Sequence, residues 1–389
     1  MTRPRIVVLG MMTKMPVGGV VWQTVHYLVG LERLGCEVWY VEAHGVHPTA
    51  FCAADGDPGT DAAAAFLHRT LARFDLGHRW AFEAMHDDGR VVGPAAASLG
   101  ELYRSAAVVL NLHGGTTPRP EHAASGRLVY LETDPVQLQV ELHDGRPETI
   151  ALLEPHVAFF TFGENYGRPG CGLPVGERFQ FHPTRQPVVL DLWEEVAPPG
   201  PNWTTVGNWR QAGRTVELHG EAYAWSKHLE WWKVRDLPRR SGRPIELALT
   251  RVQARDIERL EARGFTVRPA GEVSADPDTY RRYIAGSRGE VTVAKDQNVR
   301  LRTGWFSDRS ATYLAAGRPV VTQDTGFSEF LPTGEGLFAF DTSDDAAAAM
   351  LEVERDWDRH AKAAAGIARD HFDADMVLGS LLAELGVTA

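Results

Sequence analysis

The residues around position 307 have the types and spacing of an anion-binding helix start. Ser307 suits the N-cap of a helix, Asp308 suits its first turn, and the stretch YLAA leads to Gly317 and the apolar run PVVTQD. Free backbone amides at such a start, with the positive end of the helix dipole, favour a diphosphate, and the side chains of Arg309 and Ser310 can add contacts. An ordinary capped helix that leads into a strand explains the same residues.

Basic side chains follow two predicted strands. Lys295 comes after the apolar stretch EVTVA, is one of only five lysines, and is followed by Arg300 and Arg302. A second pair, Arg210 and Arg214, follows the stretch TTVGNW. Two or more cations can stabilise the charge that develops on a departing diphosphate. A solvated basic loop is the structural alternative for either group.

Two glycine pairs mark places where a ligand can approach the backbone. His113 follows the predicted strand AVVLNL directly, and Gly114 and Gly115 come next. Gly18 and Gly19 lie between the first predicted strand and the first predicted helix. A histidine bonded to the loop backbone and a tight turn are the respective structural alternatives.

These residues are positioned by an alternation of strands and helices. In the first half, strand, Gly-containing loop, helix and strand form a βαβ unit, which is typical of a parallel sheet. The predicted elements there are strand 6–10, helix 20–34, strand 37–43, helix 61–74 and strands 107–112, 127–133 and 156–162.

The alternation resumes after a segment with seven prolines between positions 163 and 201. The predicted elements are strand 204–209, helix 221–236, strand 244–249, helix 254–263, strand 265–269, helix 276–287, strand 290–295, helix 308–316, strand 318–324 and terminal helices. We therefore expect an α/β fold of two doubly wound, Rossmann-like domains that face a central cleft, with ligands at the carboxyl ends of the strands.

The composition excludes several other classes of protein. With 389 residues, 44% of them hydrophobic and 23% charged, the chain is long enough for two globular domains. Its net charge of -11 disfavours nucleic-acid binding. Three cysteines without CxxC spacing indicate neither a disulfide framework nor a zinc site. Because no apolar run approaches a membrane span, we expect no transmembrane segment and a soluble, cytoplasmic protein.

The stretch ATYLAAGRPVVTQDTGFSE, residues 311–329, resembles the donor-nucleotide segment of the GT-B glycosyltransferases. The opening RIVVLG, the loop with Gly18 and Gly19, and the helix closing on LERLGCEVWYVE resemble the start of the same superfamily. The resemblance implies transfer of a hexosyl or deoxyhexosyl group from a nucleotide-diphosphate donor to a small-molecule or glycan acceptor. The implied organisation is an acceptor domain at 1–180, a Pro-rich linker at 181–201, a donor domain at 202–370 and a C-terminal helix at 371–389 that can pack back on the first domain.

The resemblance also implies roles for individual residues. His113 would face the donor sugar as the catalytic residue, where it would position groups and stabilise charge. The donor diphosphate would contact Lys295, Ser307, Arg309 and Ser310, with Arg210 as a further cation, and the donor sugar or cleft would be lined by Gly18, Gly19, Gly114 and Glu329. A carboxylate after the strand at 127–133, Glu132 or Asp134, can act as a base toward the acceptor or cap the helix that starts at Pro135.

The sequence departs from the most similar GT-B group at two positions. That group has two glutamates eight positions apart, which fall here on Gly304 and Thr312, so the resemblance leaves the ribose contact and the choice between retention and inversion open. A GT-B-type sugar-nucleotide epimerase and a non-catalytic nucleotide-sugar-binding relative are the alternatives. A Rossmann oxidoreductase is disfavoured because GxGxxG is missing. We expect no metal and no cofactor beyond the nucleotide-sugar co-substrate; donor base and sugar, acceptor, stereochemical outcome and oligomeric state stay open.

Overall fold

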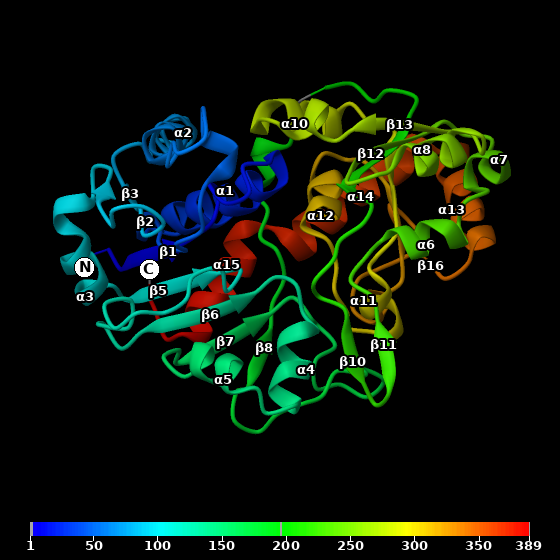
Figure 1. Cartoon of the computed structure of the whole chain (residues 1–389). Helices are drawn as coiled ribbons and strands as arrows, with labels where there is room; N and C mark the ends of the chain where they lie inside the picture. The colour runs from blue at the N-terminus through cyan, green and yellow to red at the C-terminus, as the bar shows by residue number, and fades with distance from the viewer. Residues whose placement is uncertain (1–2, 195–196, 389) are drawn as a thin grey trace.

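The computed structural model describes residues 3–194 and 197–388, so positions 195 and 196 of the predicted linker lie outside the described residues. The first half contains an eight-stranded sheet in the order β4-β3-β2-β1-β5-β6-β7-β8, in which β4 alone is antiparallel to its neighbour (Figure 1). Its strands are β1 (Arg5–Leu9), β2 (Glu37–Glu42), β3 (Trp80–Glu83), β4 (Val91–Val92), β5 (Val108–Leu112), β6 (Leu128–Glu132), β7 (Ala158–Thr161) and β8 (Phe181–Pro183).

Helices join these strands and cover the sheet. They are α1 (Gly18–Arg33), α2 (Thr60–Ala72), α3 (Leu99–Ser105), α4 (Gln137–His143) and α5 (Pro147–Leu153). Every residue of β5 and β6 is buried, as expected for parallel strands with both faces covered.

The second half contains a six-stranded, fully parallel sheet in the order β13-β12-β9-β14-β15-β16. Its strands are β9 (Trp203–Asn208), β12 (Ile245–Thr250), β13 (Phe265–Pro269), β14 (Gly289–Thr292), β15 (Val320–Gln323) and β16 (Leu337–Phe340). Its helices, with those that follow the sheet, are α6 (His228–Lys233), α7 (Leu237–Ser241), α8 (Ala254–Glu261), α9 (Gly271–Ser274), α10 (Pro277–Ala285), α11 (Asp296–Arg300), α12 (Asp308–Ala315), α13 (Ser343–Arg355), α14 (Trp357–Phe372) and α15 (Ala374–Glu384). The predicted α/β class with two doubly wound sheets is confirmed.

The helix predicted at 221–236 is wrong over its first part. Strands β10 (Val216–Leu218) and β11 (Glu221–Tyr223) form a separate antiparallel hairpin there, and only α6 is helical. His219 and Gly220 at the turn have φ of 53° and 80°. Two consecutive positive φ values suit a two-residue hairpin turn and cannot occur within a right-handed helix.

The two halves share a hydrophobic core. One cluster of buried side chains contains Trp22 of α1, Trp193 and Tyr280 of α10, and the Trp22 indole donates to the carbonyl of Pro277 at 2.7 Å. The C-terminal helix α15 crosses to the first half, where a Cβ at Gly30 of α1 would lie 2.5 Å from the Leu378 side chain (Figure 1). Within the described ranges, no helix combines the length and apolar character that crossing a membrane requires. The domain boundaries stay a prediction.

Candidate functional site

A cavity of about 520 Å³ lies between the two halves, at the carboxyl ends of strands from both sheets. The first half lines it with the loop after β1, with His113 and Gly114 after β5, and with Tyr130 and residues 132–134 at the end of β6. The second half contributes Gln211, Arg214, Trp225 and Lys295. Ligands of open parallel sheets bind at this edge, so the fold itself designates the cavity as the candidate site.

The second-half wall carries a group of hydrogen-bond donors that converge on Asp134. Lys295 Nζ lies 2.6 Å from Asp134 Oδ2, the Trp225 indole nitrogen lies 3.0 Å from it, and an Arg214 nitrogen lies 3.4 Å from it. Both cations also contact the Trp225 ring, with Lys295 Nζ 4.1 Å and the Arg214 guanidinium carbon 4.7 Å from its centroid. This wall is therefore built to hold an anionic oxygen.

Lys295 is the buried member of this group, with 8% of its surface exposed. Burial lowers the pKa of its ammonium, and the negative charge of Asp134 opposes that shift. Asp134 Oδ1 is also buried and has no hydrogen-bond partner among the described residues. The Asp134 carboxylate thus occupies, through Oδ2, the place where the second half can bind an anion, while its Oδ1 lacks a hydrogen-bond partner among the described residues.

His113 lies on the first-half wall in a left-handed backbone conformation, with φ of 65°. Gly114 follows with φ of 58°, and a Cβ there would lie 2.2 Å from the Tyr130 hydroxyl oxygen, so only glycine fits. His113 Nδ1 lies 3.0 Å from Thr133 Oγ1, while Nε2 is buried without a partner among the described residues. The strained backbone and the unpaired nitrogen are features of a ligand-contacting residue.

The imidazole of His113 is uncharged at neutral pH. Burial, with a smaller effect of the Lys14 charge, lowers its pKa to about 4. A neutral ring can hydrogen bond to a sugar but brings no positive charge. The predicted charge stabilisation by His113 is therefore limited to its hydrogen bond.

Glu132, the last residue of β6, lines the same cavity with 4% of its surface exposed. Its Oε2 accepts hydrogen bonds from Thr161 Oγ1 and Gln139 Nε2, each at 2.7 Å. Burial raises the pKa of the Glu132 carboxyl to about 7, and the two hydrogen bonds only partly counteract this effect.

Arg309 is in a different environment from the one predicted. It is 8% exposed, and its three nitrogens donate to Glu290 Oε1 at 2.5 Å, to the carbonyl of Val206 at 2.6 Å and to Thr292 Oγ1 at 3.0 Å. Arg309 does not line the cavity. The predicted diphosphate contact of Arg309 is not supported, because its donors are already engaged by Glu290, Val206 and Thr292.

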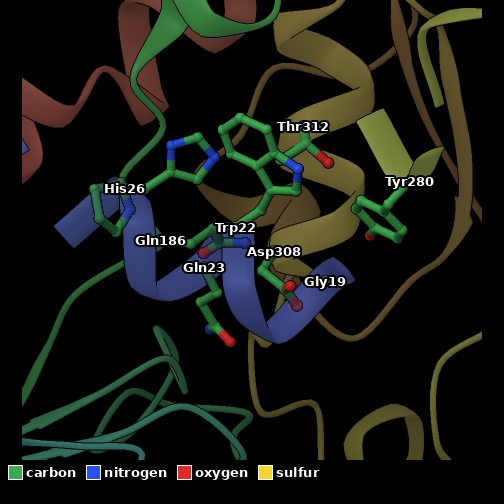
Figure 2. A pocket seen from close by; sticks show the side chains of 9 residues that line it. Gly19, Trp22, Gln23, His26, Gln186, Tyr280, Asp308 and Thr312 are labelled. Atoms are coloured by element: carbon green, nitrogen blue, oxygen red, sulfur yellow. The ribbon is translucent and has the colours of Figure 1, made fainter. Parts of the chain in front are cut away.

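The residues at the start of α12 do not line the large cavity. Ser307 and Ser310 are buried and do not line it, and Ser310 Oγ has no hydrogen-bond partner among the described residues. Asp308 lines a separate small pocket with Gly19 and Gln23, and Figure 2 shows its side chain next to the first turn of α1. Burial raises the pKa of Asp308. A carboxylate at this helix start competes with the diphosphate predicted there.

Gly18 and Gly19 allow two helices to approach. A Cβ at Gly18 would lie 2.4 Å from the Cβ of Tyr280 on α10, and a Cβ at Gly19 would lie 3.4 Å from the Tyr280 hydroxyl oxygen. Neither glycine lines the large cavity, although Gly19 borders the small pocket in Figure 2. The contact between the halves explains the glycine at position 18, whereas a Cβ at position 19 would make only an ordinary van der Waals contact.

Two further predicted residues form ion pairs outside the cavity. Glu329 is exposed and pairs with Arg302 at 2.9 Å, while Arg210 pairs with Asp256 at 2.8 Å. Of the predicted site residues, the cavity brings together His113, Gly114 and Lys295, and it does not include Gly18, Gly19, Arg210, Ser307, Arg309, Ser310 or Glu329.

Two residues of the cavity wall, Arg214 and Trp225, are not among the principal site residues predicted from the sequence. Arg214 belongs to the second basic pair predicted after TTVGNW, and Trp225 is not among the predicted site residues. Trp203, Trp209 and Trp231 are buried, whereas Trp225 borders the cavity. The signal that could have separated them is the His219-Gly220 turn, which indicates a hairpin inserted between Arg214 and Trp225.

No cluster of three or more His, Cys, Asp or Glu side chains able to hold a metal ion occurs in the part of the chain that the structure describes. The absence of a metal cofactor stays a prediction.

No protein-family model matches the chain, and no curated protein matches its sequence. Solved structures do match it over nearly its whole length. AviGT4, a glycosyltransferase involved in avilamycin A biosynthesis, is 13% identical with a TM-score of 0.56, covering 98% of this chain and 97% of its own. HepE of Anabaena in complex with UDP-glucose is 12% identical with a TM-score of 0.56, covering 98% and 99%. An alpha-glucosyltransferase in complex with UDP and a 13-mer DNA is 10% identical with a TM-score of 0.56, covering 99% and 100%.

The chain has the GT-B fold. The fold that the resemblance implies is confirmed. At 10–13% identity the comparison identifies an architecture, and the chemistry has to be argued from the cavity.

Proposed function

We propose that this chain is a glycosyltransferase that moves a hexosyl or deoxyhexosyl group from a nucleotide-diphosphate donor to a small-molecule or glycan acceptor. The observation that carries the proposal is the cavity wall on which Lys295, Arg214 and Trp225 converge on one carboxylate oxygen. In solved structures of this fold, HepE holds UDP-glucose and the alpha-glucosyltransferase holds UDP. A wall of cations at the carboxyl edge of the second sheet suits such a diphosphate.

The donor diphosphate would take the place of the Asp134 carboxylate against Lys295 and Arg214. A diphosphate carries more negative charge and more acceptor oxygens than a carboxylate, so it satisfies these donors more completely. When the glycosidic bond to the donor phosphate breaks, the bonding electron pair goes to the diphosphate. The enclosed cations stabilise that charge better than water would.

The first-half wall would hold the acceptor and the sugar. His113 lines the cavity and its buried Nε2 has no partner among the described residues, so we propose that a sugar hydroxyl supplies the missing hydrogen bond. We propose an acceptor other than nucleic acid, because the net charge of -11 repels a phosphate backbone. We also propose that transfer needs no added metal, for which unchanged turnover in the presence of a chelator is the test.

Titration with UDP, GDP, ADP and dTDP by isothermal calorimetry tests the proposal directly. We expect one of them to bind, and Lys295→Ala to weaken that binding by about 1.5 to 3 kcal/mol, the range for a hydrogen bond to a charged group. Lys362→Ala is the matched control because Lys362 is an exposed lysine of α14 and does not line the cavity. The absence of binding by all four diphosphates, or equal affinities of the Lys295→Ala and Lys362→Ala variants, would contradict the proposal.

A further inference from the structure

We infer that Glu132 is the base that takes the proton from the attacking hydroxyl group, and hence that the acceptor is an alcohol. The inference rests on the proposed function and assigns the proton transfer, a step for which the fold comparison provides no residue.

The carboxylate of Glu132 is held firmly with one oxygen directed to protein donors. Thr161 at the end of β7 and Gln139 of α4 both donate to Oε2, so two neighbouring elements fix the orientation of the carboxylate. None of the residues that the structure describes donates to Oε1, and Glu132 lines the cavity. Oε1 is thus the oxygen available to a ligand.

The other acidic side chains of the cavity are engaged elsewhere. Asp134 Oδ2 accepts from Lys295, Trp225 and Arg214. Glu141 accepts at Oε1 from Gln137 at 2.7 Å and at Oε2 from Thr149 at 2.6 Å. Asp134 Oδ1 also has no partner among the described residues, but it is buried, and Oδ2 of the same carboxylate is paired with two cations. Glu132 is therefore the carboxylate of this wall that has a free oxygen and no ion pair among the described residues.

Burial and the groups around Glu132 set its pKa in a range that suits a general base. The pKa of Glu132 is raised to about 7, mainly by burial and less by the Asp134 charge. The hydrogen bonds from Thr161 and Gln139 and the Arg214 charge act in the opposite direction. The neighbouring phenols of Tyr130 and Tyr166 stay protonated, because burial raises the pKa of each. A general base works best when its pKa lies near the working pH, which favours Glu132 over His113, whose pKa of about 4 makes it a weak base.

The groups that line the cavity account for the proton and the electron pair that move in the transfer step. The hydroxyl proton moves to Glu132 Oε1 while the hydroxyl oxygen bonds to the anomeric carbon of the donor. The bond from that carbon to the diphosphate oxygen breaks, and its electron pair goes to the diphosphate against Lys295 and Arg214. Protonated Glu132 then releases its proton to solvent when product leaves.

Donor hydrolysis, with water as the attacking hydroxyl compound, tests this assignment before an acceptor is known. UDP-glucose, GDP-mannose and dTDP-glucose are incubated with the wild type, Glu132→Gln and Glu148→Gln, an exposed glutamate of α5 that serves as control. We expect release of nucleoside diphosphate to fall about a hundredfold or more in Glu132→Gln alone, the usual size of general-base catalysis. Calorimetric affinity for the corresponding free diphosphate should stay within about twofold, since that ligand brings no proton to be removed.

Azide provides a readout that a merely structural glutamate would not affect. Azide attacks without losing a proton, so it should restore turnover of Glu132→Gln and form a glycosyl azide. In the wild type, kcat/KM should fall as the pH drops below about 7, because Glu132 becomes protonated. Thr161→Val removes a hydrogen bond that favours the ionised carboxylate, so it should move this pH midpoint upward while keeping activity at high pH.

The possible failures are distinguishable. Normal hydrolysis by Glu132→Gln, a loss that azide does not restore, or an unmoved pH midpoint in Thr161→Val would overturn the assignment of Glu132. A wild type that binds no nucleoside diphosphate and hydrolyses no donor would instead overturn the proposed function, and with it this inference.

Discussion

The substitution Arg309→Met tests whether Arg309 stabilises the fold or binds the diphosphate. The Arg309 guanidinium donates to Glu290, Val206 and Thr292, and Glu290 is fully buried. Glu290 Oε2 already lacks a partner among the described residues, so loss of the arginine would leave the whole carboxylate unpaired. Removing one partner of a buried ion pair costs about 3 to 5 kcal/mol, a large part of the about 5 to 15 kcal/mol that stabilises a typical protein.

Urea denaturation followed by far-UV circular dichroism measures this cost. We expect the free energy of unfolding of Arg309→Met to fall by about 3 to 5 kcal/mol, and that of Arg309→Met/Glu290→Gln to fall by less, because the buried charge is then gone. Arg355→Met is the control, since Arg355 forms an exposed pair with Glu352 worth about 0 to 1 kcal/mol. Under folding conditions, Arg309→Met should bind nucleoside diphosphate as the wild type does. Unchanged stability together with an affinity loss of about 1.5 to 3 kcal/mol would refute this reasoning and restore the diphosphate role predicted from the sequence.

Two other substitutions test the first-half wall. His113→Ala should lower turnover about a hundredfold while the affinity for free nucleoside diphosphate stays nearly the same, because that ligand carries no sugar; a collapse of affinity along with rate would mark His113 as structural. Asp134→Asn should tighten nucleoside-diphosphate binding several-fold in calorimetry, because the carboxylate that competes for Lys295 and Arg214 loses its charge. Weaker binding by this variant would show that Asp134 helps to hold the ligand.

Local patterns in the sequence were sufficient to predict the fold. Buried parallel strands such as β5 and β6 are short apolar runs, and Gly35 and Gly317 mark helix ends with positive φ. His113 and Lys295 could be placed at the cavity because each follows a strand whose carboxyl end is fixed by the parallel sheet.

The roles of Arg309 and of the glycine pair could not be predicted, because they depend on contacts distant in sequence. A helix start rich in polar residues looks the same whether its arginine faces a ligand or a buried glutamate 19 positions earlier. Gly18 begins its helix at a position typical of a phosphate-binding glycine, yet its close neighbour is Tyr280 in the other half. The neighbours of these residues are decided by tertiary packing, which a local sequence pattern does not reveal.

The hairpin of β10 and β11 shows how such packing builds the cavity. Val216 and Leu218 of β10 lie in one hydrophobic cluster with Leu138 and Val140 of α4, so an arm of the second half rests on a helix of the first. The arm leaves the sheet near Arg214 and returns at Trp225, and both residues thereby reach Asp134. The same α4 supplies Gln139, which orients Glu132. The helix α4 therefore contacts the hairpin that carries the proposed donor wall and, through Gln139, the carboxylate that would activate the acceptor.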